Sequence, residues 1–171
     1  MIIILSITEN LDHSNWWEAV FFNQKVKVRS IIRNEEIEYM KFFMSKTKIY
    51  CQNIIHYKNY IFFFVKPYLF QKANKYLAQL RYALIGKKVL IIKQKRRIID
   101  LIYTFFPNVN IRKLELLIKN NTGDLELLIF IPHFKERGIA VGKAGNYIKI
   151  VNEIFEEFIY PVKISCLYLR E

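Results

Sequence analysis

Hydrophobic and polar positions along this chain change period in the same order twice, and each time they predict the same succession of elements. The first stretch predicts a helix, two strands, a helix and a buried strand: residues 34–47, 49–55, 60–65, 73–84 and 89–92. Asn34 is expected to cap the first helix, whose first turn holds Glu35 and Glu36, because acidic side chains are favoured near a helix N-terminus. Pro67 interrupts the pattern ahead of the second helix.

The second stretch repeats this order and adds a short helical segment before its last helix. It predicts elements at residues 97–106, 114–118, 125–131, 135–141, 147–159 and 162–167. The sequence Asn120-Asn121-Thr122-Gly123 lies between its two strands and is typical of a hairpin turn. On the last helix, Ile148, Val151 and Phe155 share one face, which we expect to be buried.

We therefore interpret each half as the order helix, strand, strand, helical segment, helix, strand, with the helical segment distinct only in the second half; this order belongs to the α+β class. We expect residues 30–95 and 96–171 to form two similar domains in tandem. Residues 1–29 fall outside both and are expected to be a short N-terminal extension. The aromatic residues of this extension are expected to pack on the body of the protein: Trp16, Trp17, Phe21 and Phe22.

The 171-residue chain has a formal net charge of +12, and this excess is concentrated in one segment. Residues 39–99 contain 14 basic residues and no acidic residue, whereas the stretches on either side are close to balanced. Such a surplus attracts polyanions, and it releases counterions when it binds phosphates. The charge distribution favours a nucleic-acid partner over a solvated lysine-rich surface.

Ile, Lys, Asn, Phe and Tyr make up about half of the chain, a bias typical of an AT-rich genome. This composition favours the cytoplasm of a prokaryote with a reduced genome, or the stroma or matrix of an organelle. The two cysteines, Cys51 and Cys166, are too few for a disulfide scaffold and fit a reducing compartment. No apolar run approaches the roughly 18 residues of a membrane helix, so no membrane partner is expected.

Three of the five glycines lie close together, at Gly138, Gly142 and Gly145. Such clustering indicates that the backbone here adopts a conformation, or approaches another group so closely, that glycine is needed. The segment Gly142-Lys143-Ala144-Gly145 follows a hairpin and a short amphipathic segment and precedes a helix. This context resembles the GXXG loop of a KH domain, whose glycines let the backbone approach a nucleic-acid backbone near a helix N-terminus. A P-loop does not fit, because Gly138 and Gly142 are one residue too close and Ala144 replaces the magnesium-binding hydroxyl.

Residues 134–149 resemble the second KH domain of the NusA transcription factors, and the preceding hairpin fits that match. The first half resembles the first KH domain of the compact archaeal form of that family, because residues 35–44, 60–65 and 84–92 run in the expected order. The resemblance implies two tandem KH domains of the second topological type. It further implies single-stranded RNA as the ligand and action beside RNA polymerase in transcription elongation, termination or antitermination.

The first domain departs from the family pattern, because residues 67–72 stand where its own GXXG loop is expected and contain no glycine. This degenerate loop cannot clamp RNA in the usual way. Either this domain binds phosphates through a basic surface formed by Lys66, Lys72, Lys75 and Arg81, or it binds no RNA and only supports the neighbouring domain.

The RNA-binding residues expected in the second domain follow from the loop and its flanks. Gly142 and Gly145 are expected to allow close backbone approach, and Lys143 to reach phosphate. Arg137 and Lys149 are expected to flank the groove as further phosphate contacts.

We expect no enzymatic activity, no cofactor, no metal and no small-molecule substrate. His13, His56 and His133 lack local ligand spacing to one another and to the cysteines. Asp124 and Glu126 are more typical of a solvated strand edge than of a catalytic pair.

A second class of function stays open, a structural rRNA-binding component of a ribosome, including an organellar one. A KH domain of the same topology occurs in a small-subunit ribosomal protein, although the C-terminal domain of that protein has no counterpart here. A third class, an RNA chaperone or processing subunit, has no specific feature in its favour.

Overall fold

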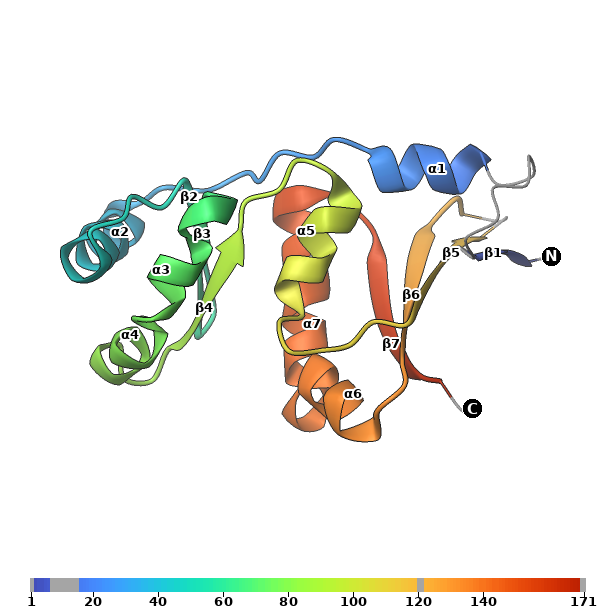
Figure 1. Cartoon of the computed structure of the whole chain (residues 1–171). Helices are drawn as coiled ribbons and strands as arrows, with labels where there is room; N and C mark the ends of the chain where they lie inside the picture. Colours follow the sequence, from blue (N-terminus) through green and yellow to red (C-terminus); the bar gives the residue numbers. More distant parts are fainter. Residues whose placement is uncertain (1, 7–15, 120–121, 170–171) are drawn as a thin grey trace. The chain divides into compact units, whose positions relative to one another are not determined.

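The structure, a computed structural model, describes residues 2–6, 16–119 and 122–169 (Figure 1). Contacts divide the chain into two compact units: unit 1 comprises Met1–Val26 and Arg97–Glu171, and unit 2 comprises Lys27–Arg96. Each unit combines helices with a mixed sheet, so the expected α+β class is confirmed.

Unit 2 consists of three helices packed on one face of a three-stranded sheet. Its elements are α2 (Asn34–Thr47), β2 (Asn53–Tyr57), β3 (Tyr60–Val65), the 3-10 turn η1 (Pro67–Leu69), α3 (Phe70–Asn74), α4 (Leu77–Ala83) and β4 (Lys88–Lys93). The strand order is β2-β3-β4, in which β2 is antiparallel and β4 parallel to β3.

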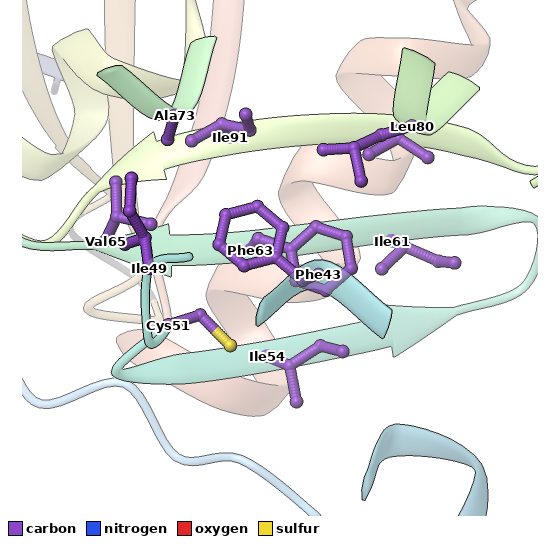
Figure 2. Close-up of a cluster of buried hydrophobic side chains, with 11 residues drawn as sticks. Phe43, Ile49, Cys51, Ile54, Ile61, Phe63, Val65, Ala73, Leu80 and Ile91 are labelled. Atoms are coloured by element: carbon purple, nitrogen blue, oxygen red, sulfur yellow. The ribbon is translucent and has the colours of Figure 1, made fainter. Parts of the chain in front are cut away.

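The core of unit 2 forms where these helices meet the strands, as Figure 2 shows. Phe43 of α2 stacks on Phe63 of β3, with ring centroids 4.5 Å apart. Ala73 of α3 and Leu80 of α4 are fully buried in the same cluster, so each helix contributes to it. Burying a side chain such as Leu80 stabilises the fold by roughly 1.5–3 kcal/mol, and this holds α3 and α4 on the sheet.

The start of unit 2 differs from the sequence-based expectation in two places. Arg33, not Asn34, is the N-cap of α2, and its main-chain N–H donates to the Glu36 carboxylate at 2.9 Å. The first strand begins later than expected because Ile49 and Cys51 are buried in the core as part of a loop. Their apolar character therefore reflects burial and not strand pairing.

The single helix expected over residues 73–84 is two helices, separated by a turn at Lys75 and Tyr76. The N–H of Tyr76 donates to the carbonyl of Ala73 at 3.0 Å, a tight i to i+3 bond that ends α3. The change of direction lets Ala73 and Leu80 both reach the core.

Unit 1 contains the order helix, strand, strand, helix, helix, strand, preceded by one further strand and helix. Its elements are β1 (Ile2–Ser6), α1 (Trp16–Asn23), α5 (Ile98–Phe105), β5 (Lys113–Lys119), β6 (Leu125–Ile131), α6 (Phe134–Val141), the 3-10 turn η2 (Lys143–Gly145), α7 (Asn146–Ile154), the π-helical turn η3 (Phe155–Ile159) and β7 (Lys163–Tyr168). The sheet order is β1-β5-β6-β7, in which β6 and β7 are parallel and the other pairs antiparallel.

The core of unit 1 lies between α5, α7 and one face of the sheet (Figure 1). Alternate strand residues point into it, among them the buried Leu116 and Leu127. Phe105 of α5 meets Phe155 edge-on, with ring centroids 5.1 Å apart. Val151 and Phe155 are buried, as the helical pattern predicted, whereas Ile148 is only half-buried.

The first 26 residues, most of the expected extension, contribute β1 and α1 to unit 1. The sequence pattern did not predict β1, which pairs antiparallel with β5. Phe21 and Phe22 of α1 are buried, and Phe21 packs edge-on against Tyr160 with ring centroids 6.0 Å apart. The following lie outside the described part of the chain: His13, Asn120, Asn121 and the side chains of Trp16 and Trp17.

Candidate nucleic-acid interface

The glycine loop between α6 and α7, residues 142–145, has backbone angles that residues with a Cβ rarely adopt. Gly142 has φ 77° and ψ 171°, and Gly145 has φ 74° and ψ 8°. Ala144 also has a positive φ, 52°, so three of the four loop residues are in conformations that L-amino acids rarely adopt. A Cβ on Gly142 would lie 2.9 Å from the main-chain nitrogen of Tyr147, so this position has no room for a side chain.

Hydrogen bonds hold the loop to α6, within itself and, through the N–H of Asn146 to the carbonyl of Lys143, to the start of α7. The N–H of Gly142 donates to the carbonyl of Gly138 at 2.8 Å, and the N–H of Gly145 donates to the carbonyl of Gly142 at 3.1 Å. At the start of α7, the hydroxyl of Tyr147 donates to the main-chain carbonyl of Phe105, the last residue of α5. The loop is therefore fixed before any ligand binds, which lowers the entropy cost of binding.

The exposed side of the loop is suited to an anion. Lys143 and Ala144 are exposed, and Lys149 is exposed on the next turn of α7. No side chain caps the N-terminus of α7, and its first turn has no acidic residue. The positive end of the helix dipole and the Lys143 ammonium thus favour a phosphate at the same place.

Arg137 lies against the sheet. Its Nε donates to the carbonyl of Cys166 in β7 at 3.2 Å, and the side chain is half-buried. Burial raises the pKa of the Cys166 thiol to about 12, although the nearby Arg137 cation lowers it. The structure thus gives Arg137 a role on the edge strand of the described sheet in addition to the expected phosphate contact.

Exposed aromatic side chains beside α6 were not identified from the sequence. Phe134, at the start of α6, is 70% exposed and meets Tyr168 of β7 edge-on, with ring centroids 6.2 Å apart. Tyr168 is itself 43% exposed. Exposed rings offer faces on which nucleic-acid bases can stack. The only sequence signal for them was their position at the ends of predicted apolar elements, where burial is incomplete.

Three of the basic residues expected to bind in unit 2 lie on its two short helices, α3 and α4, or in the turn between them. Lys72 is exposed on α3, Lys75 is exposed in the turn between the helices, and Arg81 lies on α4. The Nε of Arg81 donates to the carbonyl of Val89 in β4 at 3.1 Å, so part of this guanidinium is already used.

The segment taken as the degenerate loop, residues 67–72, is not the connection between α3 and α4. It forms η1 and the beginning of α3, and the connection is the turn at Lys75 and Tyr76. Both turn residues have right-handed backbone angles, with φ −59° and −94°. The connection is thus a tight helical turn, which offers none of the backbone geometry of the Gly142 loop.

The acidic residue Glu126 and the histidine His56 each contact neighbouring polar side chains. Glu126 accepts from the hydroxyl of Ser165 at 2.7 Å and lies 3.0 Å from the ammonium of Lys163. His56 lies 3.5 Å from the Glu35 carboxylate. Within residues 2–6, 16–119 and 122–169, no group of three or more His, Cys, Asp or Glu side chains is placed to hold a metal ion, and no helix is long and apolar enough to cross a membrane.

The chain matches no protein-family model, and it matches no curated protein sequence. Among solved structures, the crystal structure of APE1850 is similar, with a TM-score of 0.59 and 21% sequence identity. The match covers 81% of this chain and 100% of that chain. At this identity the likeness concerns the fold alone, and it supports the α+β architecture.

Proposed function

We propose that the protein binds single-stranded RNA through the loop Gly142–Gly145, and that its two units are KH domains of the second topological type. The observation that carries the proposal is the backbone of this loop, which places positive-φ glycines, an exposed lysine and an uncapped helix N-terminus together. Such a loop lets a sugar-phosphate backbone approach the main chain more closely than a side chain would permit.

The resemblance to the NusA family supports a role beside RNA polymerase, as an RNA-binding factor in elongation, termination or antitermination. On this proposal the protein is a binding factor and not an enzyme. Unit 2, residues 27–96, contains 16 basic and 3 acidic residues and would supply a sequence-independent attraction for the same RNA strand. The same positive charge would suit a permanent contact with rRNA, so a structural component of a ribosome is the second candidate function.

The test of the loop is the double variant Lys143→Asp/Ala144→Asp. Aspartate tolerates the left-handed conformation of Ala144, so the change adds negative charge at the proposed phosphate site with little backbone strain. We expect the affinity for a single-stranded RNA to fall by at least about 10-fold, because the Lys143 cation is lost and two carboxylates then repel the phosphate.

The matched control is Lys58→Asp/Asn59→Asp, in the turn between β2 and β3. It changes the net charge by the same amount, and Lys58 also has a positive φ, 54°. Its effect on RNA affinity is expected to be smaller than that of the loop variant. Equal losses in the two variants would show that only total charge matters and would refute the loop as the binding site.

The host assembly is tested by gentle purification of the tagged protein from its native source. RNA polymerase subunits in the eluate would support the transcription role. Ribosomal subunits, retained at high salt, would support the second candidate and exclude the first.

A further inference from the structure

Unit 2 has a groove on the side of α2 that the RNA proposal does not use. Its volume is about 920 Å³. One wall is the extended segment of residues 27–32, and the other is α2 with the loop that follows it. Lysine and arginine side chains lie along the same groove: Lys27, Arg29 and Lys41.

The extended wall is anchored within unit 2. Val28 is buried, and the hydroxyl of Ser30 donates to the side-chain oxygen of Asn53 at 3.3 Å. The amide nitrogen of Asn53 in turn donates to Gln94 at 3.0 Å. Both walls therefore belong to one packed unit, and the groove exists before a partner arrives.

The floor of the groove is aliphatic. Ile37, Met40 and Met44 line it at helical spacing along one face of α2. Ile37 is 39% exposed, and Ile32 on the opposite wall is 49% exposed. Large aliphatic side chains gathered in one groove are typical of a protein-docking surface, and methionine adapts its shape to apolar side chains that insert beside it.

The rim of the groove is basic. No acidic residue is among its described lining residues, which include three cations. Glu38, on α2 outside the groove, lies 3.0 Å from Lys41, but both side chains are about 70% exposed, so this pair is weak and Lys41 stays available. A ligand for this groove needs apolar side chains for the floor and carboxylates for the rim.

We propose that this groove binds a segment of a partner protein in which apolar side chains are flanked by acidic residues. An amphipathic helix with an acidic border satisfies both requirements. A second copy of the chain is disfavoured, because each copy carries a net charge of +12 and would bring like charge to a basic rim. RNA is disfavoured because the floor is aliphatic, and the only aromatic side chain among the described lining residues is Tyr50.

The experiment selects binders of the full chain from a phage-displayed library of random 16-residue peptides, with the variant Ile37→Glu as the counter-selection. Enriched peptides are expected to combine apolar residues with a net negative charge. Their affinity for Arg29→Glu/Lys41→Glu is expected to be at least 10-fold lower than for the wild type. Replacing their acidic residues by lysine should restore binding to that double variant.

The control variant Lys72→Glu/Lys75→Glu makes the same charge change elsewhere on unit 2 and should leave peptide binding unchanged. Thermal unfolding of each variant establishes that the fold is intact. Enriched peptides without acidic residues, or an equal loss of affinity in the control, would overturn the proposal. So would self-association that Ile37→Glu abolishes, which would make the occupant a second copy, or an RNA affinity that the same substitution lowers.

Discussion

An added Cβ on Gly142 would lie 2.7 Å from the Cβ of Tyr147, closer than two such carbon atoms approach in proteins. The loop and the first turn of α7 are therefore packed backbone against side chain at this point. Tyr147 is held in turn by its hydrogen bond to the carbonyl of Phe105. The shape of the candidate RNA site thus depends on the lack of a side chain at Gly142 and on the side chain of Tyr147.

Gly142→Ala is expected to destabilise unit 1 by about 1–3 kcal/mol, because Gly142 occupies a backbone region that is nearly exclusive to glycine. The clash with Tyr147 adds to this cost and should also weaken RNA binding. Chemical denaturation and an RNA titration measure the two effects. Gly138→Ala is the matched control, since Gly138 lies within α6 with open space around it, and alanine there should stabilise the helix by about 1 kcal/mol. Equal effects of the two substitutions would contradict this account.

Tyr147→Phe removes one hydroxyl and leaves the ring in place. Losing the hydrogen bond to the carbonyl of Phe105 is expected to cost about 1 kcal/mol of unfolding free energy. Tyr82→Phe serves as the control, because Tyr82 is among the exposed aromatic residues of the chain. A Tyr147→Phe variant as stable as the wild type would mean that this bond does not hold α7 to α5.

Glu18 predicts a pH dependence of stability. Its side chain is buried, and burial raises its pKa above the ordinary value; Glu115 acts in the same direction, while the N–H of Leu116 and Lys113 oppose it. One carboxylate oxygen finds no hydrogen-bond partner among the described residues. Because the folded state favours the protonated form, its stabilising contribution is present below the unfolded-state pKa and is lost as the pH rises through the folded-state pKa.

Glu18→Gln removes this titration and keeps an acceptor for the N–H of Leu116. The variant should therefore gain stability relative to the wild type as the pH rises from 4 to 8. Thermal unfolding across that range gives the comparison, and a difference that shrinks toward high pH would have the wrong sign for a buried carboxyl.

Lys72 and Lys75 test whether unit 2 binds phosphate. If these two lysines contact RNA phosphates, the variant Lys72→Glu/Lys75→Glu should bind RNA with a weaker salt dependence. The slope of log affinity against log salt concentration should fall by about 0.7 for each phosphate of the single strand that is no longer neutralised. Arg81 is left out of this variant because its guanidinium donates to the carbonyl of Val89, so its replacement would also disturb β4. An unchanged slope would assign phosphate binding to another face of the unit.

Cys51 and Cys166 are expected to resist thiol reagents in the folded protein. Both are buried, and burial raises the pKa of Cys51 to about 11 and that of Cys166 to about 12. Since the thiolate is the reacting form, labelling at pH 8 should be slow in buffer and should reach two thiols in denaturant. Fast labelling of the native protein would indicate that one unit opens locally.

The period of the apolar residues sufficed for most elements, because most helices and strands bury one face, and β3, which is buried at every position, is a continuous apolar run. The apolar period gave a wrong prediction where residues are buried without belonging to a helix or strand. Ile49 and Cys51 are apolar because a loop enters the core, and nothing in a short apolar run distinguishes that loop from a strand. The break between α3 and α4 has neither glycine nor proline to mark it, since it is made by a hydrogen bond between Tyr76 and Ala73.

The loop Gly142–Gly145 was found from the sequence because a positive φ restricts the residue type. The local partners of Arg81 and Arg137 were not found, since each donates to a strand carbonyl that only the folded chain brings near. The exposed pair of Phe134 and Tyr168 was missed for the same reason.

Unit 1 is built from two parts of the chain that flank unit 2 in the sequence, and a main-chain bridge between Lys25 and Arg97 joins them. During synthesis unit 2 is complete as soon as residue 96 has emerged, whereas β1 has no strand to pair with until β5 follows. The strand β1, which is made before unit 2, therefore finds its partner only after unit 2 is complete. A nascent chain stalled between β4 and β5 should hold a finished unit 2 behind an unpaired strand, which is the stage at which this protein is most exposed to mispairing.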